Sequence, residues 1–68
     1  MSCKGKQRWP ELVGNDGKTA ALKIESENSS VHIFILQEGS PVTSDFRCDR
    51  VRVFINTRGI VVKTPVVG

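Results

Sequence analysis

The sequence contains no tyrosine, one histidine, one tryptophan and two cysteines. The histidine, His32, lies inside an apolar segment, and the cysteines, Cys3 and Cys48, are far apart along the chain. Covalent catalysis needs a nucleophile beside a base, and a structural metal site needs ligands at short spacing. Because neither pattern is present, we expect no enzyme activity, no metal and no cofactor, and we interpret His32 as an exposed or packed strand residue.

Long apolar runs are also missing. A membrane-spanning helix needs roughly 18 or more apolar residues in succession, and no segment of the chain approaches that length. The start of the chain, Met-Ser-Cys-Lys-Gly-Lys, lacks the apolar stretch of a secretory signal. We therefore expect a soluble chain with no membrane partner.

The positive charge is small and is not concentrated in one place. Ten Lys and Arg residues against seven Asp and Glu residues give a formal net charge of +3. The basic residues are scattered, and aromatic residues make up only 6% of the chain, so nucleic-acid bases would find few rings to stack on. We expect no nucleic-acid partner, although the basic balance keeps that class as an alternative.

The length of the chain limits its stability. The sequence has 68 residues, which predicts one domain over residues 1–68. A domain of this size buries only roughly 60% of the surface that its unfolded chain exposes. The margin of stability is therefore small, and a covalent staple would increase it.

One helix is predicted after the turn signal at residues 15–17. Asp16 is a suitable N-cap for a helix over residues 18–27. Its narrow apolar stripe consists of Ala20, Ala21 and Ile24. Small alanines allow a helix to approach a sheet closely. Before the helix, Trp9 lies in an irregular segment and is interpreted as a structural residue packed against the core.

Two main strands are predicted from runs of β-branched and aromatic residues. The first covers residues 31–36, and its expected core face consists of Val31, Ile33 and Ile35. The second begins at residue 50, and strand alternation divides its residues between two faces. One face consists of Arg50, Arg52 and Phe54, and the core face consists of Val51, Val53 and Ile55.

The connection between these strands is too long for a tight hairpin. Fourteen residues separate Leu36 from Val51, which favours parallel strands whose ends are joined by an arching polar segment. After the second strand, residues 56–59 form a turn signal. A short strand is predicted at residues 60–62, followed by a tail that ends at Gly68.

The arching segment is the part of the chain that we expect to contact a partner. Residues 39–47 include Pro41, Val42 and Thr43, whose side chains favour extended backbone. The nearest acceptors in sequence for Arg50 and Arg52 are Thr43 and Asp45. A planar guanidinium suits a carboxylate or a carbonyl oxygen as its partner. The alternative is ordinary surface ion pairing, which contributes only about 0 to 1 kcal/mol per exposed pair.

Four strings of residues also carry a family resemblance. They are Trp-Pro-Glu-Leu-Val-Gly at 9–14, Glu-Gly-Ser-Pro-Val-Thr at 38–43, Asp-Phe-Arg-Cys-Asp-Arg-Val-Arg-Val-Phe at 45–54 and Thr-Pro-Val-Val-Gly at 64–68. In this order and spacing, they resemble the potato inhibitor I family of serine proteinase inhibitors, in particular its small plant seed members with one disulfide. The resemblance implies an α+β fold, with one helix packed on a small mixed sheet and an exposed protease-binding loop between two parallel strands.

The resemblance also implies a functional site. The bond presented to the protease would be Ser44-Asp45, and Arg50 and Arg52 would brace the loop through Thr43 and Asp45. The loop would consist of Gly39, Ser40, Pro41, Val42, Thr43, Ser44, Asp45, Phe46 and Arg47. Phe54 would support the loop from below, and Gly68 would lie near the bracing arginines.

A disulfide between Cys3 and Cys48 is implied by the same resemblance. Closing a loop of about 46 residues would stabilise the fold by about 4 kcal/mol in the chain-entropy model. Such a bond fits an oxidising compartment, secreted or seed storage, whereas two free thiols in a reduced cell are the alternative. The pair would anchor the N-terminus beside the loop.

Ser44 departs from the family pattern. Many relatives carry a lysine, arginine, leucine or methionine at this position, which enters the primary pocket of the protease. Serine neither reaches the acid of a trypsin pocket nor fills a chymotrypsin pocket, so we expect a preference for subtilisin-like or elastase-like proteases over trypsin. The alternative is a binding module on the same scaffold that does not inhibit. A monomer is expected, and the resemblance implies a role in plant defence and the response to wounding.

Overall fold

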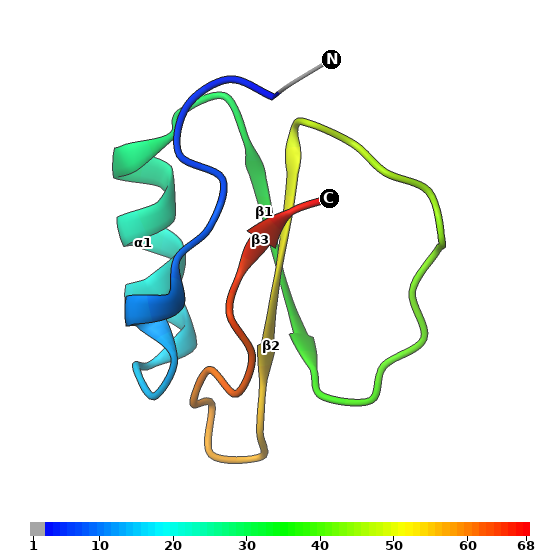
Figure 1. Cartoon of the computed structure of the whole chain (residues 1–68). Coiled ribbons are helices and arrows are strands. Elements are labelled where there is room, and N and C mark those ends of the chain that lie inside the picture. Colours follow the sequence, from blue (N-terminus) through cyan, green and yellow to red (C-terminus); the bar gives the residue numbers. More distant parts are fainter. Residues whose placement is uncertain (1–2) are drawn as a thin grey trace.

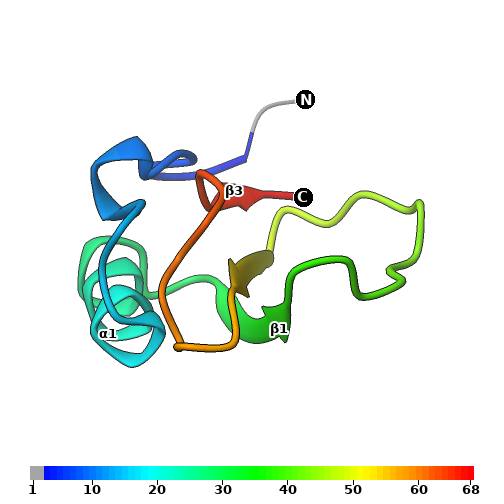
Figure 2. The ribbon, with the colours of Figure 1, turned by 90° about the horizontal axis from the view of Figure 1, so that it is seen from below.

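The computed structural model describes residues 3–68. Its elements in chain order are the short 3-10 helix η1 (Pro10–Leu12), the helix α1 (Gly17–Glu27) and the strands β1 (His32–Gln37), β2 (Arg50–Ile55) and β3 (Val66–Val67). The helix lies on one side of the sheet, and the segment between β1 and β2 projects on the other side (Figure 1; Figure 2). The predicted α+β arrangement of one helix and a small mixed sheet is confirmed.

The sheet places its strands in the order β1-β2-β3. β1 and β2 are parallel, with His32 opposite Arg50 and Gln37 opposite Ile55. β3 is antiparallel to β2, with Val67 opposite Val51. Parallel neighbours cannot be joined by a tight turn, so residues 38–49 travel back along the sheet and form the arch.

The helix begins where the sequence predicts. The Asp16 side chain accepts hydrogen bonds from the backbone N–H groups of Lys18 and Thr19, at 3.0 and 3.2 Å. These bonds satisfy donors that have no partner inside the first turn. Ala20 and Ile24 are fully buried, so the predicted apolar stripe faces the sheet. Gly17 is close to β2, because a Cβ there would lie 2.9 Å from Cγ2 of Ile55.

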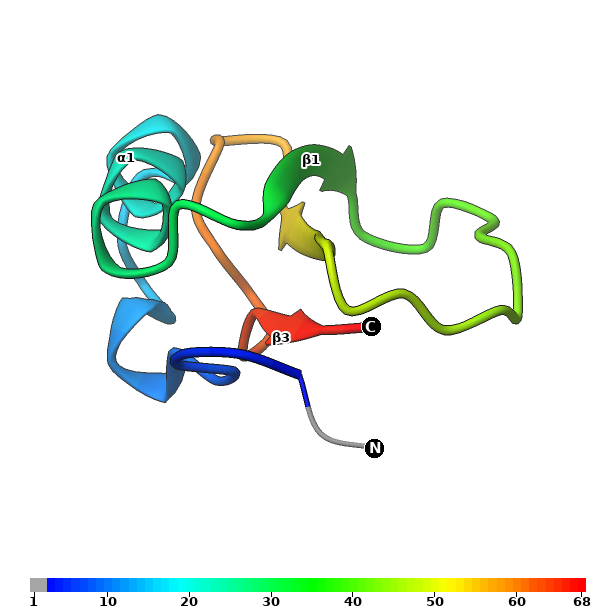
Figure 3. The ribbon, with the colours of Figure 1, turned by 90° about the horizontal axis from the view of Figure 1, so that it is seen from above.

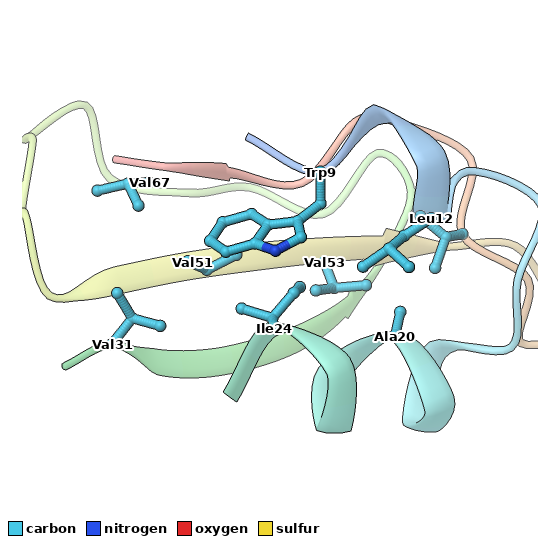
Figure 4. Packing of buried hydrophobic residues seen from close by; sticks show 9 residues of the cluster. Trp9, Leu12, Ala20, Ile24, Val31, Val51, Val53 and Val67 are labelled. Carbon is cyan, nitrogen blue, oxygen red and sulfur yellow. The ribbon is translucent and has the colours of Figure 1, made fainter. Parts of the chain in front are cut away.

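The core lies between α1, the sheet and the N-terminal segment (Figure 4). Trp9 is fully buried, and its Nε1 donates a hydrogen bond of 2.8 Å to Oε1 of Glu27. Burial of the ring with its one polar atom paired confirms the structural interpretation of Trp9. The buried hydrophobic residues are Trp9, Leu12, Ala20, Ile24, Val31, Val51, Val53, Val61 and Val67.

The expected core face of the first strand is only partly correct. Val31 is buried and Ile33 packs against the core, but Ile35 is 41% exposed. Ile35 lines a shallow hollow with Lys18 and Leu22, at the margin of α1. The reason is that β1 is an edge strand with no neighbour on its outer side, so Ile35 at the margin of α1 stays open to solvent.

The expected strand at residues 60–62 was wrong. Ile60 and Val61 form only isolated bridges, to Asp16 and Ile55, and the third strand is β3 in the predicted tail. Val62 N still donates a hydrogen bond of 2.9 Å to the Phe54 carbonyl, and the chain pairs with β2 again at β3. The carbonyl of Pro65 accepts a hydrogen bond of 3.0 Å from Trp9 N, which draws the tail toward the N-terminal segment.

Two further features bear on partners. His32 was interpreted as either an exposed or a packed strand residue, and the structure shows that it is exposed. Within residues 3–68, no helix is long and apolar enough to cross a membrane.

Candidate functional site

The segment from residue 38 to residue 49 forms a wide arch that stands away from the sheet (Figure 1; Figure 3). Every residue from 41 to 48 is exposed, and none of them belongs to a helix or strand. Val42 and Phe46 are 47% and 66% exposed, although both are hydrophobic. Exposed apolar side chains on a loop without internal backbone pairing make this segment the strongest candidate for contact with a partner.

Two arginines of β2 hold the arch on either side of Ser44. Arg52 Nη2 donates a hydrogen bond of 2.8 Å to the Thr43 hydroxyl. Arg50 Nη2 donates to the Asp45 carbonyl oxygen at 2.8 Å and to its carboxylate Oδ1 at 3.2 Å, and Arg50 Nη1 lies 3.4 Å from Oδ2. Strand alternation makes this possible, because Arg50 and Arg52 lie on the face of β2 opposite the buried Val51. Ser44 is therefore flanked by two anchored residues.

The C-terminal tail holds Arg50 and the descending side of the arch, which is residues 45–49 and returns to β2. Arg50 Nε donates a hydrogen bond of 2.8 Å to the Gly68 oxygen, and Gly68 N donates to the Arg50 carbonyl at 2.9 Å. The same Gly68 oxygen accepts a bond of 3.2 Å from Arg47 N. A Cβ at position 68 would lie 3.7 Å from the Phe46 ring. The tail thus fixes both Arg50 and the loop residue Arg47.

A second ion pair in the arch was missed by the sequence reasoning. Arg47 Nε and Nη2 donate to Oδ1 and Oδ2 of Asp49 at 3.0 and 3.1 Å. This two-pronged pairing orients the chain just before β2. The available signal was an arginine two residues before an aspartate, but either residue could equally have faced solvent.

Phe54 lies beside the C-terminal tail. It is half-buried, and its ring is 5.0 Å from Lys63 Nζ. The hollow that Phe54 lines is bounded by Arg52 and by residues of the C-terminal tail. A role for Phe54 in supporting the loop remains a prediction, and any such support would act through Arg52.

The predicted disulfide between Cys3 and Cys48 is confirmed. The two residues are separated by 45 positions, and their Cα atoms lie 5.1 Å apart. Cys48 is the residue between the Arg47–Asp49 pair, so the bond ties the N-terminal segment to the descending side of the arch. The proximity of the two segments is visible in Figure 3.

The two sides of the arch are held unequally. The ascending side has a backbone bond of 3.1 Å from Ser40 N to the Gln37 carbonyl, close to the end of β1. Beyond it, Pro41 and Val42 border a hollow of about 260 Å³ whose floor includes Phe34 and Leu36. The descending side has Arg50, the tail and the disulfide. The rigid part of the arch is therefore residues 43–49.

Asp45 has an unusually stable negative charge. Hydrogen bonding from the Thr43 hydroxyl and from the Arg50 guanidinium lowers its pKa from 3.8 to about 2. A carboxylate with a lowered pKa favours the folded state fully above its ordinary pKa, and this contribution is lost as the pH falls through the folded-state value.

We therefore expect the anchoring of the arch to weaken between pH 3.8 and about 2. The measurement is an NMR titration of the Asp45 carboxyl carbon, whose midpoint should lie near pH 2 in the native protein. In an Arg50→Gln variant the midpoint should rise toward the ordinary value, because the guanidinium is gone. An equally low midpoint in that variant would show that Arg50 does not hold the carboxylate.

The site has the chemistry of a binding surface. Within residues 3–68, no group of three or more His, Cys, Asp or Glu side chains could hold a metal ion. The arch presents an exposed peptide that is braced from β2, with a bend at Ser44, and Ser44 has no histidine beside it in sequence.

Comparisons with known proteins agree with this site. A model described as the Potato inhibitor I family matches residues 2–68. The "Glu S.griseus protease inhibitor" of Momordica charantia is 54% identical over 66 residues, which are 97% of this chain and 97% of that protein. The "Inhibitor of trypsin and hageman factor" of Cucurbita maxima is 54% identical over 67 residues, which are 98% of each protein.

A solved structure shows that the resemblance extends to the fold. The crystal structure of bitter gourd trypsin inhibitor has a TM-score of 0.96 to this chain, with 50% sequence identity and coverage of 100% of both chains. Family, relatives and fold agree over nearly the whole chain, and the named relatives are inhibitors of proteinases, not enzymes. This chain belongs to the potato inhibitor I family of serine proteinase inhibitors.

Proposed function

We propose that this chain inhibits serine proteases by presenting the Ser44-Asp45 bond in a rigid, substrate-like loop. The observation that carries the proposal is the bracing of both neighbours of Ser44. Arg52 bonds Thr43 on one side, and Arg50 bonds the backbone and side chain of Asp45 on the other. The Ser44 side chain is exposed between them and is free to enter a protease pocket.

Rigidity explains how a substrate-like loop would inhibit. A flexible peptide loses conformational freedom when it binds, whereas a loop already held in the bound shape avoids much of this loss. If the protease cleaves the Ser44-Asp45 bond, Arg50 still holds Asp45 through its carbonyl oxygen and its carboxylate. The new amine therefore stays close to the acyl group and favours resealing over release.

The residue at position 44 determines which protease pocket the loop fits. Serine is too short for the acid at the bottom of a trypsin pocket, and a large apolar pocket would lose about 1.5 to 3 kcal/mol of burial relative to a large apolar side chain. We infer a preference for small or tolerant pockets, as in elastase-like and subtilisin-like enzymes. The names of two relatives refer to trypsin, but the specificity of this chain follows from its own Ser44.

The first test is a titration of the oxidised protein against subtilisin, elastase, chymotrypsin and trypsin under identical conditions. We expect stoichiometric loss of subtilisin or elastase activity and weak or absent inhibition of trypsin. Tight inhibition of trypsin alone would contradict the assignment of Ser44 to the primary pocket. If none of the four proteases loses activity, the alternative of a scaffold that binds without inhibiting would be favoured.

The disulfide leads to a second prediction about the cleaved protein. Cleavage at Ser44-Asp45 gives fragments 1–44 and 45–68, and the Cys3–Cys48 bond still joins them. Linked fragments meet at an effective concentration in roughly the millimolar range, whereas separate fragments meet at their bulk concentration. We expect cleaved, oxidised protein to regain inhibition at nanomolar dilution.

Reduction should abolish this recovery. The measurement compares protease inhibition by cleaved protein with and without a thiol reductant, and intact reduced protein is the control for effects of the disulfide on the uncut loop. We expect the reductant to weaken the cleaved protein far more than the intact protein. Equal losses would mean that the bond contributes only to stability and does not keep the fragments together for resealing.

A further inference from the structure

One sequence motif is not explained by the inhibitor function. Asn28-Ser29-Ser30 has the form Asn-x-Ser, the acceptor pattern for N-linked glycosylation, and no other stretch of the sequence has that form. Such acceptors normally lie on exposed surface, because the enzyme attaches a large polar sugar to the asparagine amide nitrogen. Asn28 is only 6% exposed, so this motif and the fold conflict.

Asn28 ends α1 and holds the N-terminal segment in place. Its Nδ2 donates hydrogen bonds of 3.0 Å to the carbonyl oxygens of Lys4 and Lys6. Its Oδ1 accepts a bond of 3.1 Å from Ser30 N. Both hydrogens of the amide nitrogen are therefore used, and a glycan would replace one of them.

The space around the amide is also closed. A Cβ added to Gly5 would lie 3.1 Å from Nδ2 and 3.2 Å from Cγ of Asn28. A site that has little room for one extra methyl group on its neighbour has no room for a sugar ring. A glycan would displace residues 4–6, which directly follow Cys3, and would move this cysteine away from Cys48. The N-terminal segment lies against the end of α1 in Figure 1.

We propose that Asn28 is a glycosylation acceptor of the unfolded chain only, so that glycosylation at Asn28 and native folding are alternative fates. A chain that folds first buries the amide and is protected. A chain that is modified first lacks the two bonds to Lys4 and Lys6 and does not close the Cys3–Cys48 disulfide. The sugar therefore marks chains that have not folded in a glycosylating compartment.

The test produces the full chain behind a cleavable secretion leader in yeast, with mass spectrometry of the secreted and the retained protein. Val51→Asp places a charge at a fully buried core position and prevents folding. Arg58→Ser creates a matched acceptor, Asn-Thr-Ser at 56–58, in a turn away from the arch where the Asn56 side chain accepts hydrogen bonds through its oxygen. Ser30→Ala removes the natural acceptor and retains the Asn28 bonds, because only the backbone N–H of Ser30 takes part.

We expect secreted wild-type protein to carry the disulfide and no sugar at Asn28. The Val51→Asp chain should carry a sugar at Asn28 and lose it when Ser30→Ala is added. The Arg58→Ser protein should be secreted with a sugar at Asn56 and with unchanged protease inhibition. Secreted, disulfide-bonded protein that carries a sugar at Asn28 would overturn the proposal. So would a Val51→Asp, Arg58→Ser chain that is modified at Asn56 and not at Asn28.

Discussion

Replacement of Ser44 by lysine is expected to convert this chain into a strong trypsin inhibitor. The lysine ammonium would reach the acid at the bottom of the trypsin pocket, and a complex that lacks one partner of such a buried charge pair is weaker by about 2 to 5 kcal/mol. At 1.4 kcal/mol for each factor of ten, this corresponds to about 30- to 4,000-fold tighter inhibition of trypsin. The measurement is the inhibition constant for trypsin, before and after the substitution.

Two control variants separate charge from position. Ser44→Met gives a long neutral side chain at the same place, which should improve inhibition of chymotrypsin and leave trypsin weakly inhibited. Ser40→Lys adds the same charge elsewhere in the loop and should have little effect on trypsin. If Ser44→Lys leaves trypsin inhibition unchanged while the protein remains folded, the reactive bond is not Ser44-Asp45.

Removal of both loop-bracing arginines should cause the largest loss of inhibition. The two braces hold the residues on either side of Ser44, and ordering the backbone of one residue costs roughly 1 to 2 kcal/mol. Without the braces, Thr43 and Asp45 would have to be ordered when the protease binds, which weakens binding by about 2 to 4 kcal/mol for the two residues together. The Arg50→Ala, Arg52→Ala protein should inhibit about 30- to 1,000-fold more weakly.

The control for this result is a change of equal charge away from the loop. Arg8 and Arg58 are exposed, and an Arg8→Ala, Arg58→Ala protein should inhibit as the native protein does. Arg50→Lys with Arg52→Lys keeps the charge but loses the planar fork, and it should recover only part of the inhibition. Near-ultraviolet circular dichroism of the buried Trp9 verifies folding. Unchanged inhibition in the folded double alanine variant would exclude bracing by these arginines.

The support of the arch is concentrated on the two neighbours of Ser44. Thr43 and Asp45 are bound to β2, whereas Pro41 and Val42 border an open hollow. Under the proposed function, a substitution at Ser44 would alter the contact with the protease while both anchors remain. This arrangement is consistent with relatives that share the fold and are named for different proteases.

Much of the site could be predicted from local sequence signals. Alternation along β2 separates Arg50 and Arg52 from Val51 and Val53, whatever the rest of the chain does. A long polar connection between two apolar runs predicts an arch. The assignment of the reactive bond came from the family resemblance, because no periodicity or spacing identifies one exposed serine among several. The Arg47–Asp49 pair was not predicted, because its geometry depends on the path of the chain into β2.

Local sequence signals are enough to predict the helix start at Asp16, the two main strands and the division of β2 into an apolar and a basic face. These features depend on neighbours within a few residues, where backbone sterics and capping act directly. Three other features arise from long-range packing: Ile35 is exposed, β3 lies at Val66–Val67, and Gly68 supports Arg50 and Arg47. Each of these depends on which distant segments meet, and that is decided by the packing of the whole chain around Trp9, Val51 and Val53.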